Sequence, residues 1–215
     1  MREDKVLFCA CFLPCDYSRG FLFYVLILNR KGLVIMKKIK TRTLTVVAIL
    51  AAAAFLLQML GSFMQLKVAG FLEIEFSDLP AIIGTMALGP AAGVTIELVK
   101  NLLKCMATTT GFIGEFANFV VNGSFVLAAG LVYLRNKTRK GALIAFIIGT
   151  VAMTIVALLA NIFIMLPLYM PNADFAARFS LALTTITPFN LVKGIVLSII
   201  TFFIYKPLSP IIKGK

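Results

Sequence analysis

The sequence predicts an all-α membrane protein, a bundle of six transmembrane helices with both termini in the cytoplasm. The 215-residue chain is 60% apolar, only 14% charged, and has a mean hydropathy of +0.99, whereas soluble domains are about half apolar and a quarter charged. Several apolar stretches reach the roughly 17 to 25 residues that a helix needs to cross a bilayer. The basic residues behind the net charge of +12 form short clusters between these stretches, which indicates topology signals and no nucleic-acid partner.

Residues 1–35 differ from the rest of the chain. Their apolar run at 21–28 is too short to span a bilayer, and Met36 begins a lysine-rich flank of the kind expected before a first span. Arg30-Lys31-Gly32 can have purine-rich codons, as a ribosome-binding site would. We expect 1–35 to be a non-native or disordered upstream extension and 36–215 to form the transmembrane domain. A loosely ordered interfacial segment is the alternative.

Six apolar segments follow in order. They are predicted at residues 43–66, 77–89, 91–109, 113–134, 141–166 and 186–205. Gly89-Pro90 gives a tight break between the second and the third. The stretch between the first two is predicted to be a non-membrane loop in which "FLEIEF" alternates like an edge strand. In the last segment we expect Thr187 as N-cap and Pro188 at the first helical position.

The basic clusters give these spans a direction. Three clusters fall on one side of a six-span bundle, and they comprise Lys37, Lys38, Lys40 and Arg42, then Arg135, Lys137, Arg139 and Lys140, then Lys206, Lys213 and Lys215. The connecting segments on the other side hold only Lys67 and Arg178. The positive-inside rule therefore predicts cytoplasmic termini, with the loops after spans one, three and five outside.

This direction places almost all strongly polar side chains at membrane depth in the outer half of the bundle. Asn190 and Lys193 share a face of the last span, and Asn161 reaches the same depth on the span before it. The pattern predicts a cup, open to the outside, for a polar and partly aromatic small molecule. In the alternative, Lys193 snorkels to the outer interface and Asn190 bonds a neighbouring backbone.

Glu97, Lys100 and Asn101 share one face of the third span. We favour a structural interpretation for them, an ion pair that Asp78 joins and that fixes helix packing, because a lone buried charge costs far more than a paired one.

Ala48 and Ala52 lie four residues apart on the first span. Small residues at this spacing let a second helix approach closely in lipid, and the spacing leaves open whether that helix is internal or belongs to another protein. The chain has no Walker motif, so it cannot itself hydrolyse ATP, and an uptake protein of this kind needs a partner. It also has no histidine, which excludes His-based catalysis and His-ligated metal sites.

Five stretches carry a family resemblance. They read "FLEIEFSDLPAIIG" (71–84), "GPAAGVTIELVKNLL" (89–103), "GEFANFVVNGSFVLAAGLVY" (114–133), "GTVAMTIVALLANIFIMLPLY" (149–169) and "TPFNLVKGIV" (187–196). Over about 37–210 the chain resembles the substrate-binding S components of energy-coupling factor (ECF) vitamin transporters, and within them the riboflavin-binding members. The resemblance implies a multi-pass protein of a prokaryotic plasma membrane. It would capture riboflavin outside and release it inside together with a transmembrane scaffold subunit and two cytosolic ATPases.

The resemblance also assigns residues. Asn161, Asn190 and Lys193 match positions that hold the ligand, and the loop contribution falls on Leu72, Glu73, Ile74, Glu75 and Phe76. Residues behind these contacts would be Asp78, Glu97, Lys100, Asn101 and Asn118. Ala48 and Ala52 match the small-residue motif that contacts the scaffold subunit. Ile162 departs from the pattern, which has an aromatic residue after the asparagine.

No cofactor or metal is expected, since riboflavin would be the transported substrate. An amide can pair with the flavin's alternating carbonyl and N–H edge, and a lysine can donate to ring or ribityl oxygens. An S component for another vitamin, such as folate or thiamine, is the alternative within transport. A membrane enzyme is the alternative outside it, and the lack of histidine and of metal-spaced carboxylates argues against it.

Overall fold

The structure is a computed structural model of the chain. It describes residues 10–11, 24–28, 34–38, 41–63, 67–68, 72–73, 76–107 and 112–213. The chain divides into two compact units, residues 1–46 and 47–215.

The first unit contains a small antiparallel sheet. Its strands β1 (Ala10–Cys11), β2 (Tyr24–Leu28) and β3 (Val34–Lys38) pair in that order, with Leu26 opposite Met36. The sequence did not predict these strands, and β3 crosses the expected native start. That residues 1–35 are an upstream extension stays a prediction.

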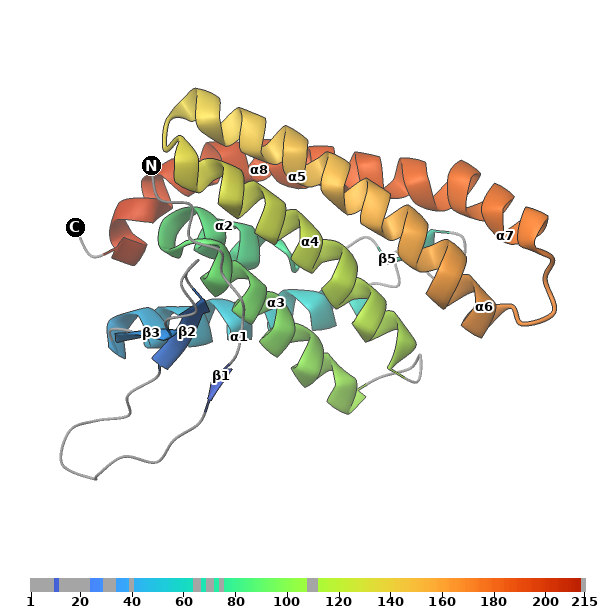
Figure 1. Cartoon of the computed structure of the whole chain (residues 1–215), viewed down its shortest axis with the longest axis horizontal. Helices are drawn as coiled ribbons and strands as arrows, with labels where there is room; N and C mark the ends of the chain where they lie inside the picture. Colours follow the sequence, from blue (N-terminus) through green and yellow to red (C-terminus); the bar gives the residue numbers. More distant parts are fainter. Residues whose placement is uncertain are drawn as a thin grey trace. The chain divides into compact units, whose positions relative to one another are not determined.

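Each of the six predicted segments contains a helix. These are α1 (Thr41–Phe63), α2 (Leu79–Leu88), α3 (Pro90–Lys104), α4 (Ile113–Arg135), α5 (Arg139–Ala160) and α8 (Thr187–Lys213). Shorter helical pieces extend three of them, namely the 3-10 turn η1 (Cys105–Ala107), the π turns η2 (Asn161–Met165) and η3 (Ala182–Ile186), and the helices α6 (Leu166–Tyr169) and α7 (Phe175–Leu181). Figure 1 shows α4, α5 and α8 as long neighbouring helices.

Four helices in the described part of the chain are long and apolar enough to cross a membrane. They cover Thr41–Gly61, Ile113–Arg135, Arg139–Tyr169 and Phe175–Leu208. The other two, α2 and α3, have 10 and 15 residues and are joined at Gly89, whose φ of 110° favours glycine. Every residue of α2 from Pro80 to Met86 is buried, so this short helix lies inside the bundle.

Two prolines explain the two π turns. A proline has no N–H and its ring clashes with the carbonyl four residues earlier, so an uninterrupted α-helix cannot accommodate it without distortion. Pro167 and Pro188 each follow a π turn by two residues, and the wider turn keeps the helix continuous. The expected N-cap at Thr187 was therefore wrong. Its backbone is helical (φ −62°, ψ −54°), and the helical run begins at Phe175.

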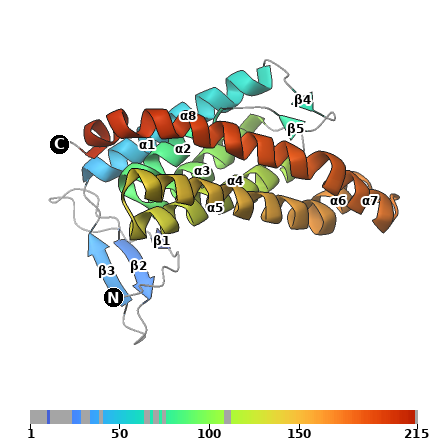
Figure 2. The same ribbon diagram turned by 90° about the horizontal axis from the view of Figure 1, so that it is seen from above.

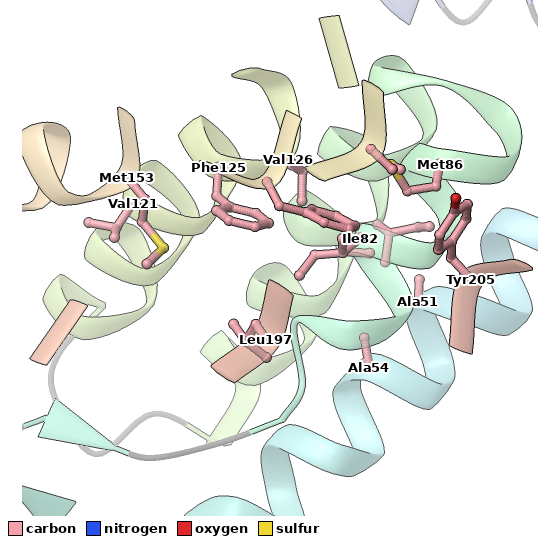
Figure 3. Close-up of a cluster of buried hydrophobic side chains, with 14 of the residues drawn as sticks. Ala51, Ala54, Ile82, Met86, Val121, Phe125, Val126, Met153, Leu197 and Tyr205 are labelled. Carbon is pink, nitrogen blue, oxygen red and sulfur yellow. The ribbon is translucent and has the colours of Figure 1, made fainter. Parts of the chain in front are cut away.

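The main core lies between α1, α2, α3, α4, α5 and α8. Figure 3 shows the buried side chains that fill it, among them Ala51 and Ala54 of α1, Ile82 of α2, and Phe125 of α4. A second and smaller buried cluster, which we call the π-turn cluster, joins η2 and α6 to η3 and comprises Ile162, Leu166, Ala182 and Ile186.

The predicted non-membrane loop contains a short hairpin. Strands β4 (Lys67–Val68) and β5 (Leu72–Glu73) pair antiparallel, with Val68 opposite Leu72. The predicted edge strand is confirmed for the two residues of β5.

Candidate functional site

Asn161 and Asn190 each lie at or near one of the two π turns. Asn161 is the first residue of η2, and Asn190 follows η3 by one helical turn. Both are buried, at 9% and 6% exposure. Each Nδ2 donates to the carbonyl four residues earlier, Asn161 to Ala157 at 2.7 Å and Asn190 to Ile186 at 2.9 Å. This bond uses one N–H of each amide, and the second N–H and the carbonyl oxygen keep further hydrogen-bonding capacity.

The π-turn cluster brings these two amides to the same end of the bundle. The helical runs α5–α6 and α7–α8 lie side by side (Figure 2), and η2 contacts η3. Ile162, which replaces the aromatic residue of the family pattern, is 5% exposed and packs in this cluster. The substitution therefore falls on a packing position, next to the amide and not at it.

Lys193 is held by an ion pair in the bundle. Its Nζ lies 2.8 Å from Oδ2 of Asp78 and donates to Oδ1 of Asn122 at 3.4 Å, and the side chain is 12% exposed. Because the ammonium is paired with a buried carboxylate, Lys193 does not snorkel to the interface. The other half of that alternative is confirmed, since Asn190 bonds a nearby backbone carbonyl, that of Ile186.

The predicted ion pair between Glu97 and Lys100 is confirmed, and Asp78 joins it. Lys100 Nζ lies 2.7 Å from Oε2 of Glu97 and 2.5 Å from Oδ1 of Asp78. None of the three side chains is more than 2% exposed. With Lys193 they form a cluster of two cations and two carboxylates, which we call the charge cluster. Its formal charge is zero, so no charge in it is left buried without compensation.

Amides extend the charge cluster across the bundle. Asn122 Nδ2 donates to Asp78 Oδ1 at 3.0 Å and also to Asn118 Oδ1. Asn101 Nδ2 donates to Oε2 of Glu97 at 3.4 Å, and Asn101 Oδ1 accepts from Gln58 Nε2 at the same distance. Asp78, Glu97, Lys100, Asn101 and Asn118 thus all belong to one network with Lys193.

Three members of this network were not among the predicted site residues. They are Asn122, Gln58 and Ser77, whose Oγ lies 3.4 Å from Lys100 Nζ. Asn122 could have been found, because it follows Asn118 by one helical turn and therefore shares its face. Ser77 and Gln58 carry no such signal, because their contacts depend on how α1 and α2 pack on α3.

The structure describes the predicted loop contribution only in part. Leu72 and Glu73 lie in β5, Phe76 is 45% exposed just before α2, and Ile74 and Glu75 fall outside the described residues. Which loop groups reach a ligand stays a prediction.

The two small residues predicted for helix docking lie on the exposed side of α1. Val47, Ala51, Ala54 and Gln58 are buried against the core, whereas Ala48 and Ala52 are both exposed. The spacing left open an internal partner for this face, and within the described residues no helix covers it. The exposed alanine face is therefore available to a helix of another protein or to lipid.

Taken together, the site offers neutral and cationic donors at one end of a helical bundle. Two buried amides lie beside the π-turn cluster, and an ammonium on the same helix as Asn190 is fixed by Asp78. Such groups can hold a neutral ligand rich in carbonyl, N–H and hydroxyl groups.

The chain is similar to several known transporter components. The family model "ECF transporter, substrate-specific component" matches residues 42–205. The riboflavin transporter RibU of Staphylococcus aureus is 35% identical over 81% of this chain and 94% of its own. The riboflavin transporter FmnP of Bacillus subtilis is 33% identical over 82% and 96%. A solved structure described as the S component of a bacterial ECF transporter superposes with a TM-score of 0.67 at 34% identity, covering 80% of this chain and 98% of that one.

Proposed function

We propose, on the premise that this chain belongs to the substrate-specific components of ECF transporters, that it captures riboflavin outside the cell and passes it inward. The observation that carries the proposal is the lysine held by Asp78 on the same helix as a buried amide, Asn190. A second buried amide, Asn161, lies in a π turn that contacts the π turn preceding Asn190. The named substrate of the relatives supports riboflavin as the ligand.

Helix lengths support a position near the outer surface for these donors, if the basic clusters lie in the cytoplasm. Asn161 follows the 22 residues of α5, about 33 Å along the helix from its basic start at Arg139. Lys193 lies about 20 Å from Lys206 by the same measure. In a hydrocarbon layer about 30 Å thick, Asn161 reaches the far edge and Lys193 lies in the outer half. We propose the six-span topology with cytoplasmic termini on this ground, α2 and α3 being the two short spans.

The ligand chemistry fits the donors. The isoalloxazine ring presents an edge of alternating carbonyl and N–H groups, which an asparagine amide can match with its own donor and acceptor. We assign this role to Asn161 and Asn190. Lys193 would donate to a ring or ribityl oxygen, and the loop 72–76 would contribute further ligand contacts. A ligand without the matching edge would leave buried polar groups unpaired, which gives selectivity.

The partners proposed for transport are a membrane scaffold subunit and two cytosolic ATPases. The chain has no Walker motif, so the energy must come from another protein. The exposed face of Ala48 and Ala52 supports a docking helix from the scaffold, since small side chains allow helix backbones to approach closely.

The family is a transporter component and not an enzyme, which sets aside the membrane-enzyme alternative. Riboflavin is then a substrate to be carried and not a cofactor. Within the family, the relatives named above support riboflavin over folate or thiamine.

The test is a binding measurement on the purified chain in detergent. Riboflavin is titrated against the protein while flavin fluorescence is followed, with thiamine and folate as control ligands. We expect saturable quenching and a rise in the melting temperature with riboflavin alone. Lys193→Ala or Asn190→Leu should weaken binding while membrane insertion stays intact. A protein that neither quenches riboflavin nor melts later in its presence would rule out the proposed function.

A further inference from the structure

Asp78 stands at the start of α2 but does not act as a helix cap. An aspartate at the N-cap position commonly accepts a bond from a backbone N–H of the first turn, and here the side chain makes no such bond. Both of its oxygens instead face side chains from other helices. Oδ1 contacts Lys100 of α3 at 2.5 Å and accepts from Asn122 of α4 at 3.0 Å, and Oδ2 faces Lys193 of α8 at 2.8 Å.

The two oxygens thus have different partners. Oδ1 is fixed by two buried groups, Lys100 at 0% and Asn122 at 2% exposure. Oδ2 faces a cation that is part-exposed, on the helix that carries Asn190. Once the first oxygen is fixed, the second has little freedom, and the ammonium that pairs with it is fixed too.

We infer that Asp78 is the positioning residue for Lys193 in riboflavin binding, an inference that rests on the proposed function. A lysine ammonium has three N–H donors on a long flexible stem. Asp78 and Asn122 take two of them, which leaves the third for the ligand and removes the stem's freedom before the ligand arrives. Binding is stronger when a donor is already ordered, because less side-chain entropy is lost when the ligand associates.

Glu97 provides the matched control for a purely structural role. It is as buried as Asp78 and pairs with the same Lys100, at 2.7 Å. In the part of the chain that the structure describes, Glu97 makes no ion pair with Lys193. Asp78→Asn and Glu97→Gln therefore both remove a direct contact of Lys100, and only the first also removes a direct contact of Lys193.

The experiment compares the wild-type chain, Asp78→Asn, Glu97→Gln, Lys193→Gln and the double variant Asp78→Asn/Lys193→Gln in detergent. For each, riboflavin affinity is measured by flavin fluorescence and the melting temperature is measured without riboflavin. We expect both carboxylate variants to melt earlier. Asp78→Asn should weaken riboflavin binding about tenfold or more, as expected for loss of a charge-assisted contact. Glu97→Gln should weaken affinity clearly less than Asp78→Asn does, because it removes no direct contact of Lys193.

The double variant separates positioning from a general disturbance. If Asp78 acts through Lys193, adding Asp78→Asn to Lys193→Gln should change the affinity by less than about twofold, although the melting temperature still falls. If Asp78→Asn does not fold, Asp78→Glu keeps the charge and moves it by one methylene group. That variant should stay folded and bind riboflavin more weakly than the wild type.

Three results would overturn the inference while the wild type still binds riboflavin. They are unchanged affinity in a folded Asp78 variant, an equal loss in Glu97→Gln, or a further loss when Asp78→Asn is added to Lys193→Gln. A wild-type chain that does not bind riboflavin would instead reject the proposed function, so the two failures are distinct.

Discussion

Lys100 is the central cation of the charge cluster, and its removal should destabilise the fold strongly. In Lys100→Met, Glu97 loses the cation 2.7 Å away and Asp78 loses the one 2.5 Å away. Asp78 keeps Lys193, but Glu97 keeps no cation among the described residues and is 0% exposed. Each lost contact is worth about 6 kcal/mol of Coulomb energy at an effective dielectric constant of about 20.

The net effect is smaller than this sum, because the lysine no longer has to be desolvated. Breaking a buried pair from one side costs about 3 to 5 kcal/mol. For a chain of this size, each kcal/mol lowers the melting temperature by about 2 to 4 °C, so we expect a fall of about 6 to 20 °C. The chain has no tryptophan, so far-UV circular dichroism of the ligand-free protein in detergent is the suitable measurement.

A second variant tests whether Lys100→Met loses stability because it leaves a buried carboxylate without a cation. Glu97→Gln/Lys100→Met removes one charge of each sign and leaves the pair of Asp78 and Lys193 intact. It should recover at least about half of the lost stability, since no buried carboxylate is left without a cation. The reasoning would be refuted by a Lys100→Met variant that melts with the wild type, or by a double variant that is less stable than the single one.

Three further predictions concern binding, docking and packing. Asn190→Leu should weaken riboflavin binding by about tenfold or more with the melting temperature nearly unchanged, and equal affinity would remove the amide from the site. Ala52→Trp, on the exposed face of α1, should spare riboflavin binding and impair cellular uptake, whereas Ala51→Trp, at 1% exposure, should impair folding itself. Normal uptake by Ala52→Trp would argue against docking there. Gly130→Ala would bring a Cβ within 2.7 Å of Pro90 Cβ and should cost about 1 to 3 kcal/mol, while Gly123→Ala, whose nearest contact is 3.8 Å, should not destabilise. Equal melting temperatures for the two glycine variants would contradict the packing shown.

The helices were predictable from hydropathy, but their ends were not. Each apolar segment contains a helix, because lipid requires the backbone to bond internally. The last helical run begins at Phe175, ahead of the predicted residue 186. The prediction left this stretch out because it contains Arg178, one serine and two threonines. Hydropathy indicates only the part of a helix that lies in lipid. A helix that continues beyond the lipid keeps its backbone hydrogen bonds but is no longer apolar, so hydropathy does not predict where it ends.

The site, too, could be predicted from the sequence only in part. Asn161, Asn190 and Lys193 could be grouped from the sequence, since the direction of each span gives the depth of its residues. The ion pair of Glu97 and Lys100 followed from their spacing on one helix. The link between Lys193 and Asp78 could not be predicted, because it depends on the packing of α2 against α8, and no periodicity within one helix reports that.

This link changes how the lysine in lipid is understood. A lysine at membrane depth costs about 2.5 to 3.5 kcal/mol on insertion scales, and a carboxylate that pairs with it offsets part of that cost. The same ion pair fixes where the ammonium lies. It therefore both lowers the cost of a lysine at membrane depth and sets the position of its ammonium. A loss of affinity in any single variant of the charge cluster therefore does not by itself identify a ligand contact. Comparing riboflavin affinity in the Asp78 and Glu97 variants separates the two effects. Both carboxylates contact Lys100, and only Asp78 also contacts Lys193.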